Sequence, residues 1–169
     1  MISGKEGKEM FDKYGEFDSS KEINDKAAEL KAAGDTQGLK TLAIENGLDK
    51  EDVQDYIDGT ISELTTPALA AIGKIAVEAQ DIKAFGVLAD WVGQINVMCS
   101  QSVAFAQSVR KKGKNLIDCF AEVIEEESKN RKEIDTRITK KIKGCPERLS
   151  ISTLTTKEQI GIITQYYRR

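Results

Sequence analysis

The stretch Leu39–Asp58, LKTLAIENGLDKEDVQDYID, has the residue spacing of a helix-turn-helix unit. Such a unit needs a small residue on its first helix, a glycine in the turn and apolar residues that lock the second helix onto the first. These positions are filled by Ala43, Gly47, Leu48, Val53 and Tyr56. We therefore expect two short helices joined by a tight turn, in a chain of the all-α class.

The second helix of this unit carries the wrong charge for reading DNA. A recognition helix enters the major groove between phosphate backbones that attract Lys and Arg and repel carboxylates. Here the helix presents a single lysine, Lys50, among Asp49, Glu51, Asp52, Asp55 and Asp58. It either imitates DNA towards a cationic partner or faces water. The predicted partner-binding residues on this acidic face are Glu51, Asp52, Asp55 and Asp58.

Charge is distributed unevenly along the 169 residues. Residues 1–100 hold 10 Lys and Arg against 19 Asp and Glu, whereas residues 101–169 hold 15 against 9. A chain with an acidic half and a basic half indicates a strongly charged partner, including nucleic acid for the basic half. The alternative is that the two halves pack together and partly neutralise each other.

The length and the helix signals predict a compact bundle of about eight or nine helices. We expect an acidic N-terminal lobe over residues 1–64 and, over residues 65–169, a helical core with a basic C-terminal region, packed as one compact unit. Helix start and stop signals, including Thr66–Pro67 and a Thr155–Glu158 capping box, predict the individual helices. Their expected ranges are 5–14, 19–34, two helices within 35–58, then 67–79, 85–109, 115–129, 133–143 and 156–168.

Apolar residues at helical spacing predict which faces are buried. The helix over 85–109 is expected to be the central core helix, with Trp91 and Cys99 filling volume rather than binding a ligand. In the other helices the predicted inward residues are Leu69, Ile72, Ala76 and Ala79, then Leu116, Phe120, Val123 and Ile124, then Ile134, Ile138 and Ile142, and finally Ile160, Ile163 and Tyr167. The segment SISTLTT, residues 150–156, is expected to be a loop or briefly paired extended chain.

Two basic clusters are candidate contacts for nucleic acid or an acidic partner. Arg110, Lys111, Lys112 and Lys114 surround Gly113 at the end of the central helix, and four cations exceed what the helix dipole rewards. Lys140 and Lys141 project away from the apolar stripe of the helix expected over 133–143, on its outer face.

Several functional classes lack their residues in this sequence. The chain has no histidine, the commonest general base and metal ligand, and its three cysteines are widely spaced with no CxxC pair. It shows neither a phosphate-binding loop nor a nucleophile elbow, and no long apolar run. We expect a cytoplasmic protein that is not an enzyme, needs no metal or cofactor and does not enter a membrane.

Five segments together resemble a family. They are EINDKAAELKAAGD, LAIENGLDKEDVQDYIDG, AAIGKIAVEA followed by ADW, VRKKGKNLIDCFAEVI, and TKEQIGIITQYY. In that order they are similar to small proteins of phages and mobile elements of Firmicutes, a group that includes an anti-CRISPR inhibitor of type II-A Cas9. The resemblance covers most of the chain except residues 140–150. It implies binding to Cas9 with its guide RNA and inhibition of target DNA recognition or cleavage, with some contact to DNA or RNA.

Two other classes of function fit the same residues. One is a DNA-binding accessory or regulatory protein of a mobile element that holds DNA through its basic half. The other is a structural or interaction protein without nucleic acid, in which the charge asymmetry drives self-association.

Overall fold

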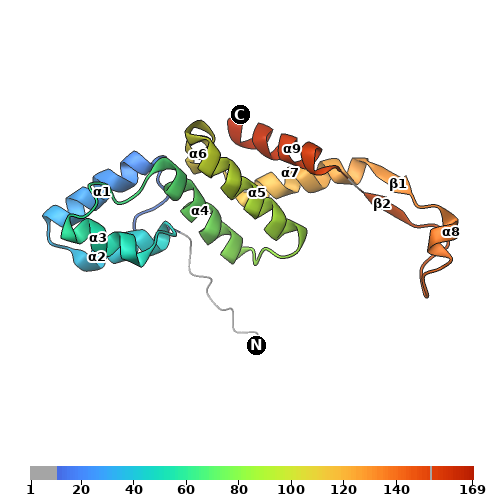
Figure 1. Cartoon of the computed structure of the whole chain (residues 1–169), viewed down its shortest axis with the longest axis horizontal. Coiled ribbons are helices and arrows are strands. Elements are labelled where there is room, and N and C mark those ends of the chain that lie inside the picture. Colours follow the sequence, from blue (N-terminus) through green and yellow to red (C-terminus); the bar gives the residue numbers. More distant parts are fainter. Residues whose placement is uncertain (1–10, 153) are drawn as a thin grey trace. The chain divides into compact units, whose positions relative to one another are not determined.

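The computed structural model describes residues 11–152 and 154–169, which form nine helices and two short strands (Figure 1). The chain divides into two compact units, the first ending at Leu116 and the second spanning Ile117–Arg169. The division expected at residue 64 falls inside the first unit. The all-α fold class is confirmed, while most of the helix predicted over 5–14 lies outside the described residues.

The described residues of unit 1 form six helices that lie wholly within it, and side-chain caps begin five of them. The helices are α1 (Ser20–Ala32), α2 (Thr36–Glu45), α3 (Lys50–Asp58), α4 (Pro67–Asp81), α5 (Val87–Gln101) and α6 (Val103–Arg110). The oxygens of the Ser19, Asp35, Asp49, Thr66 and Ser102 side chains each accept a hydrogen bond from an amide of the following first turn. Such caps satisfy donors that the helix itself leaves unpaired, so the local sequence fixes where these helices start.

Helix α4 contacts three other helices of unit 1. It contacts α1, α5 and α6, and Figure 1 shows these helices beside it. The predicted buried face of α4 is wrong, because Leu69 and Ala76 are exposed. The buried face consists instead of Ala70, Ala71, Gly73, Lys74, Ile75 and Glu78. Three of these six residues are small, which lets neighbouring backbones approach closely. Lys74 and Glu78 place two ionisable groups on the same buried face.

The prediction of a single helix over 85–109 is also wrong, because the helix is interrupted at Ser102. The backbone of Ser102 is extended and its hydroxyl caps α6, so α5 and α6 are separate helices. Phe85 precedes α5 and its side chain is 77% exposed. Trp91 and Cys99 are buried, as predicted for residues that fill the core.

Around Gly47, helices α2 and α3 contact each other as the spacing predicts. Ala43, Val53 and Tyr56 are buried in one apolar cluster, and Leu48 packs against it. Whether this pair is a true helix-turn-helix stays a prediction.

The turn before α3 lies directly against α4 through two glycines. Gly47 has a φ of +64°, which favours glycine, and a Cβ on it would lie 2.3 Å from the carbonyl oxygen of Gly73. A Cβ on Gly73 would lie 2.1 Å from the carbonyl oxygen of Asn46. The two backbones therefore touch with no room for a side chain, and this contact fixes the start of α3 relative to α4.

Unit 2 comprises most of α7 (Leu116–Lys129), β1 (Arg131–Glu133), α8 (Thr136–Thr139), β2 (Ser150–Ser152) and α9 (Thr156–Arg168). The capping box at Thr155 is present, and the range of α9 agrees with the predicted one. Ile163 and Tyr167 of α9 are buried, as are Phe120 and Val123 of α7. Ile124 is half exposed, so its predicted inward position is wrong.

The helix expected over 133–143 is wrong as well. Residues 131–133 pair antiparallel with residues 150–152, in the register Lys132 opposite Ile151, and only four residues of the expected range are α-helical. Ile138 and Ile142 are exposed, so their four-residue spacing does not mark a buried face. The alternative of paired extended chain within residues 150–156 is confirmed.

Replacing Gly73 by alanine should destabilise unit 1, because its Cβ would clash with the backbone at Asn46. Overpacking of this kind costs roughly 1–3 kcal/mol. Gly93, inside α5, is the matched control, since a Cβ there meets nothing within 4 Å. Gly93→Ala should raise the free energy of unfolding by about 0.5–1 kcal/mol. Urea denaturation of the two variants measures both effects, and equal stability would contradict the backbone contact.

Candidate functional site

The exposed face of α3 holds the predicted acidic residues. Glu51, Asp55 and Asp58 are exposed and Asp52 is partly exposed, whereas Val53 and Tyr56 point into the core. Glu51 and Asp52 lie in the first turn, where the helix dipole favours negative charge. The structure therefore places all four side chains on one solvent-facing side of a short helix.

These carboxylates are not neutralised within the described part of the chain. No ion pair of up to 4 Å joins any of the four to a Lys or Arg there. Asp58 accepts a hydrogen bond from Gln54 Nε2 at 2.9 Å, and that donor is uncharged. The acidic face thus presents net negative charge to water.

An open groove of about 620 Å³ runs beside the N-terminal end of α3. Its charged lining consists of Asp49, Glu51 and Asp52 with a single lysine, Lys50, and its apolar lining includes Leu48, Leu69 and Ile72. Leu69 is exposed here because the buried face of α4 is turned away from it. The groove combines apolar contact area with carboxylates, a combination suited to a basic segment of a protein partner.

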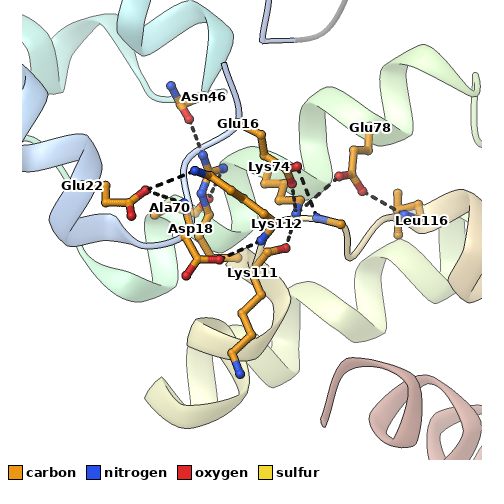
Figure 2. Close-up of polar contacts among 12 residues, drawn as sticks. Glu16, Asp18, Glu22, Asn46, Ala70, Lys74, Glu78, Lys111, Lys112 and Leu116 are labelled. Carbon is orange, nitrogen blue, oxygen red and sulfur yellow. Dashed lines mark hydrogen bonds and ion pairs between the residues drawn. The ribbon is translucent and has the colours of Figure 1, made fainter. Parts of the chain in front are cut away.

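A network of buried charges lies inside unit 1 (Figure 2). The Lys74 side chain has no exposed surface, and its Nζ lies 2.5 Å from Glu16 Oε1 and 3.9 Å from Glu78 Oε1. Lys74 Nζ also donates to the carbonyl oxygen of Lys111 at 2.9 Å. Glu78 in turn accepts from the Leu116 amide at 2.9 Å. Both buried ionisable side chains of α4, Lys74 and Glu78, therefore have ion-pair or hydrogen-bond partners.

Arg110 belongs to the same network, although the sequence placed it among the surface cations. It is 1% exposed, and its Nη2 donates to Asn46 Oδ1 at 2.5 Å while Nη1 donates to the carbonyl oxygen of Ala70 at 3.4 Å. Its guanidinium lies 5.7 Å from the centroid of the Phe11 ring. The side chain thus connects α6, α4 and the end of α2, and it is not part of the exposed surface.

The rest of this basic cluster meets acidic residues near the N-terminus of α1. The Lys112 amide donates to Asp18 Oδ1 at 3.0 Å, and Lys112 Nζ lies 4.0 Å from Glu22. The Gly113 amide donates to Glu16 Oε2 at 3.3 Å. Lys111 and Lys112 are exposed and Lys114 is partly exposed. Within unit 1 the acidic and basic parts of the sequence therefore do pack together.

Burial shifts the pKa values of two groups in the network. Desolvation raises the pKa of Glu78 to about 7, although Lys74, the Leu116 amide and Arg110 act in the opposite direction. Desolvation lowers the pKa of Arg110 to about 10, against the attraction of Glu16, Glu78 and Glu22. Arg110 therefore remains charged at neutral pH. The carboxyl group of Glu78 titrates near neutral pH.

The described residues offer few groups for metal binding or nucleophilic catalysis. No cluster of three His, Cys, Asp or Glu residues that could hold a metal occurs in residues 11–152 and 154–169. Cys99 is buried, and desolvation raises the pKa of its thiol to about 12, which disfavours the nucleophilic thiolate. In the same residues no helix has the length and apolar character needed to cross a bilayer.

Comparison with protein-family models, curated proteins and solved structures finds no match for this chain. The functional interpretation therefore depends on the surfaces themselves and on the resemblance of the five sequence segments.

Glu78 should make the stability of unit 1 depend on pH. Its folded-state pKa of about 7 lies above the ordinary value of 4.5, so the folded chain binds more protons than the unfolded chain between these values. The free energy of unfolding should consequently fall as pH rises from about 5 to 8, by up to about 3 kcal/mol. Glu78→Gln, which keeps an acceptor for the Leu116 amide, should remove this part of the pH dependence.

Urea denaturation at several pH values measures it. Glu63→Gln is the matched control, since Glu63 is exposed, and its profile should follow that of the unchanged protein. If the free energy of unfolding varied with pH in the same way for the unchanged protein and Glu78→Gln, burial would not raise the pKa of Glu78.

Proposed function

We propose that this protein binds a type II-A Cas9–guide RNA complex and inhibits target DNA recognition or cleavage, as a binding protein without catalytic activity. The proposal combines the resemblance of the five sequence segments with the acidic face of α3. The observation that carries it is that Glu51, Asp52, Asp55 and Asp58 share one exposed side and lack ion-pair partners among the described residues.

Such a face is complementary to the surfaces that Cas9 uses for DNA. Cas9 holds its nucleic acids in positively charged channels and reads the short motif beside its target with arginines. Carboxylates at fixed positions attract the same Lys and Arg side chains that target phosphates would contact. Electrostatic complementarity also accelerates association and excludes partners of like charge. The acidic face would therefore compete directly with target DNA.

The acidic helix is held in place before any partner arrives. Val53 and Tyr56 anchor it in the core, and the contact between Gly47 and Gly73 fixes its first turn. At its other end, Lys31 Nζ donates to the carbonyl oxygen of Tyr56 at 2.5 Å and lies 4.5 Å from the ring centroid. A preformed surface loses little conformational entropy on binding, which supports high affinity for a small helix.

The exposed cations supply a second, weaker contact in this proposal. Lys111, Lys112, Lys114, Lys140 and Lys141 would approach phosphates of the guide RNA or of DNA. Arg110 is left out of this set because its guanidinium is buried against Asn46 and Ala70.

Cleavage of a matched plasmid by a type II-A Cas9–guide complex tests the proposal as the protein is titrated in. We expect cleavage to be lost in a dose-dependent manner, at concentrations that do not shift the naked plasmid in a gel. Asp52→Lys with Asp55→Lys should abolish the inhibition, because both substitutions reverse the charge facing the cationic partner.

The matched control is Glu63→Lys with Asp81→Lys, which makes the same change in net charge at exposed positions outside α3. It should inhibit as the unchanged protein does, and circular dichroism should show both double variants folded. Full inhibition by the Asp52 and Asp55 variant would refute the role of the acidic face. Full cleavage at every concentration, together with a shift of the naked DNA, would favour a DNA-binding accessory protein instead.

A further inference from the structure

Residues 131–152 of unit 2 form a segment with almost no buried side chains, here called the basic arm. It contains β1, α8 and β2, and Figure 1 shows the two strands leading away from α7 and α9 to α8 at the far end. Every residue of β1 is exposed, and so are the first two of β2. A two-stranded ribbon with no core beneath it is only marginally stable in water. The arm therefore contributes little to the stability of the fold.

The basic arm nevertheless has a defined conformation. Beyond the three-residue ladder, the Ile134 amide donates to the carbonyl oxygen of Leu149 at 2.8 Å. Farther out, Thr139 is buried, and its hydroxyl donates to the carbonyl oxygen of Glu147 at 2.8 Å. These contacts hold the two sides of the arm together from the strands out to Thr139 and Glu147, so the backbone of this part of the arm has a defined course.

The positive charge of unit 2 is concentrated in this segment. The basic arm has seven Lys and Arg against three Asp and Glu, whereas the remaining residues of unit 2 have four against six. Two of the seven cations form ion pairs, Arg137 with Asp135 and Lys140 with Glu147. Within the described residues the other five have no carboxylate within 4 Å, namely Arg131, Lys132, Lys141, Lys143 and Arg148.

From this arrangement we infer that the basic arm binds duplex DNA through its phosphate backbones. The major groove of B-form DNA is about 12 Å wide and admits a two-stranded β-ribbon. A ribbon lying there would have Lys132 on one face and the cations at 141–148 towards the flanking phosphates. The exposed Ile138, Ile142 and Ile151 would contact sugars and thymine methyl groups.

Composition favours duplex DNA over other polyanions. The basic arm contains no aromatic residue. Surfaces for single strands rely on aromatic side chains that stack on bases, and membrane-interface segments rely on Trp and Tyr anchors. The major groove of A-form RNA is too deep and narrow for side chains to read. A ribbon with cations and isoleucines therefore matches the open groove of DNA best.

The proposed function already brings Lys140 and Lys141 near phosphates, and this inference extends that contact to the whole basic arm and specifies duplex DNA. It does not depend on the acidic face binding Cas9. The basic arm lies in unit 2, whereas the acidic face lies in unit 1, and neither surface requires the other. Binding of DNA by the arm would add an affinity for the target itself, whichever protein the acidic face engages.

Fluorescence anisotropy with a labelled DNA duplex, over salt concentrations from 50 to 200 mM, tests it on the full chain. The variant Lys141→Gln, Lys143→Gln and Arg148→Gln removes three exposed charges. Each lost phosphate contact should lower the slope of log affinity against log salt by about 0.9. We expect the slope to become shallower by about three, and the affinity at 100 mM salt to fall at least about tenfold.

The matched control, Lys40→Gln, Lys50→Gln and Lys157→Gln, removes the same charge at exposed positions outside the arm and should leave the slope unchanged. An equal slope for the arm variant and the unchanged protein would overturn the inference. So would an absence of duplex binding, or tighter binding to single-stranded DNA, duplex RNA or phosphatidylserine vesicles under the same conditions.

Discussion

The buried lysine of α4 is the constraint on which unit 1 depends. An ammonium group with no exposure to water is stable only when opposite charge and hydrogen-bond acceptors surround it. Lys74 obtains these from Glu16, Glu78 and the carbonyl oxygen of Lys111, so segments far apart in the sequence must come together. Removing one partner of such a group costs roughly 3–5 kcal/mol, because an uncompensated charge stays behind. The arrangement of α1, α4 and α6 follows from that requirement.

The signals that the sequence predicts well are local. The side-chain caps at Thr66 and Thr155 and the turn at Gly47 fix helix ends through neighbours within a few residues. The buried face of α4 has no such signal. Alanines occur on several sides of this helix, so more than one face has a similar hydrophobicity. The face that is buried is the one that contains Gly73. Gly73 contacts Gly47 and Asn46 through backbone atoms, and such a contact leaves no periodic pattern in the sequence.

The same reasoning explains the candidate sites. Acidic residues of α3 can be placed from the sequence because a short amphipathic helix has only one apolar side, here Val53 and Tyr56. Arg110 could not be placed, since its burial depends on Asn46, 64 residues away. Its one sequence signal is its position one residue after the buried Val109, on a helix whose other cations follow the end. The strand at 131–133 is not predicted, because isoleucines four residues apart imitate a helix in the residues that follow, while its partner strand lies about twenty residues away in the sequence.

The distribution of carboxylates in unit 1 separates two uses of the same charge. Glu16, Asp18 and Glu22 neutralise cations or cap amides of the 110–113 segment, and Glu78 is buried beside Lys74. The acids of α3 take no part in this network, although they lie on the same unit. The first group is therefore tied to cations and amides of distant segments, whereas the second group makes only local contacts within α3. Carboxylates without an ion-pair partner among the described residues, held on an anchored helix, are the ones available to a partner, and this is why we propose α3 as the binding surface.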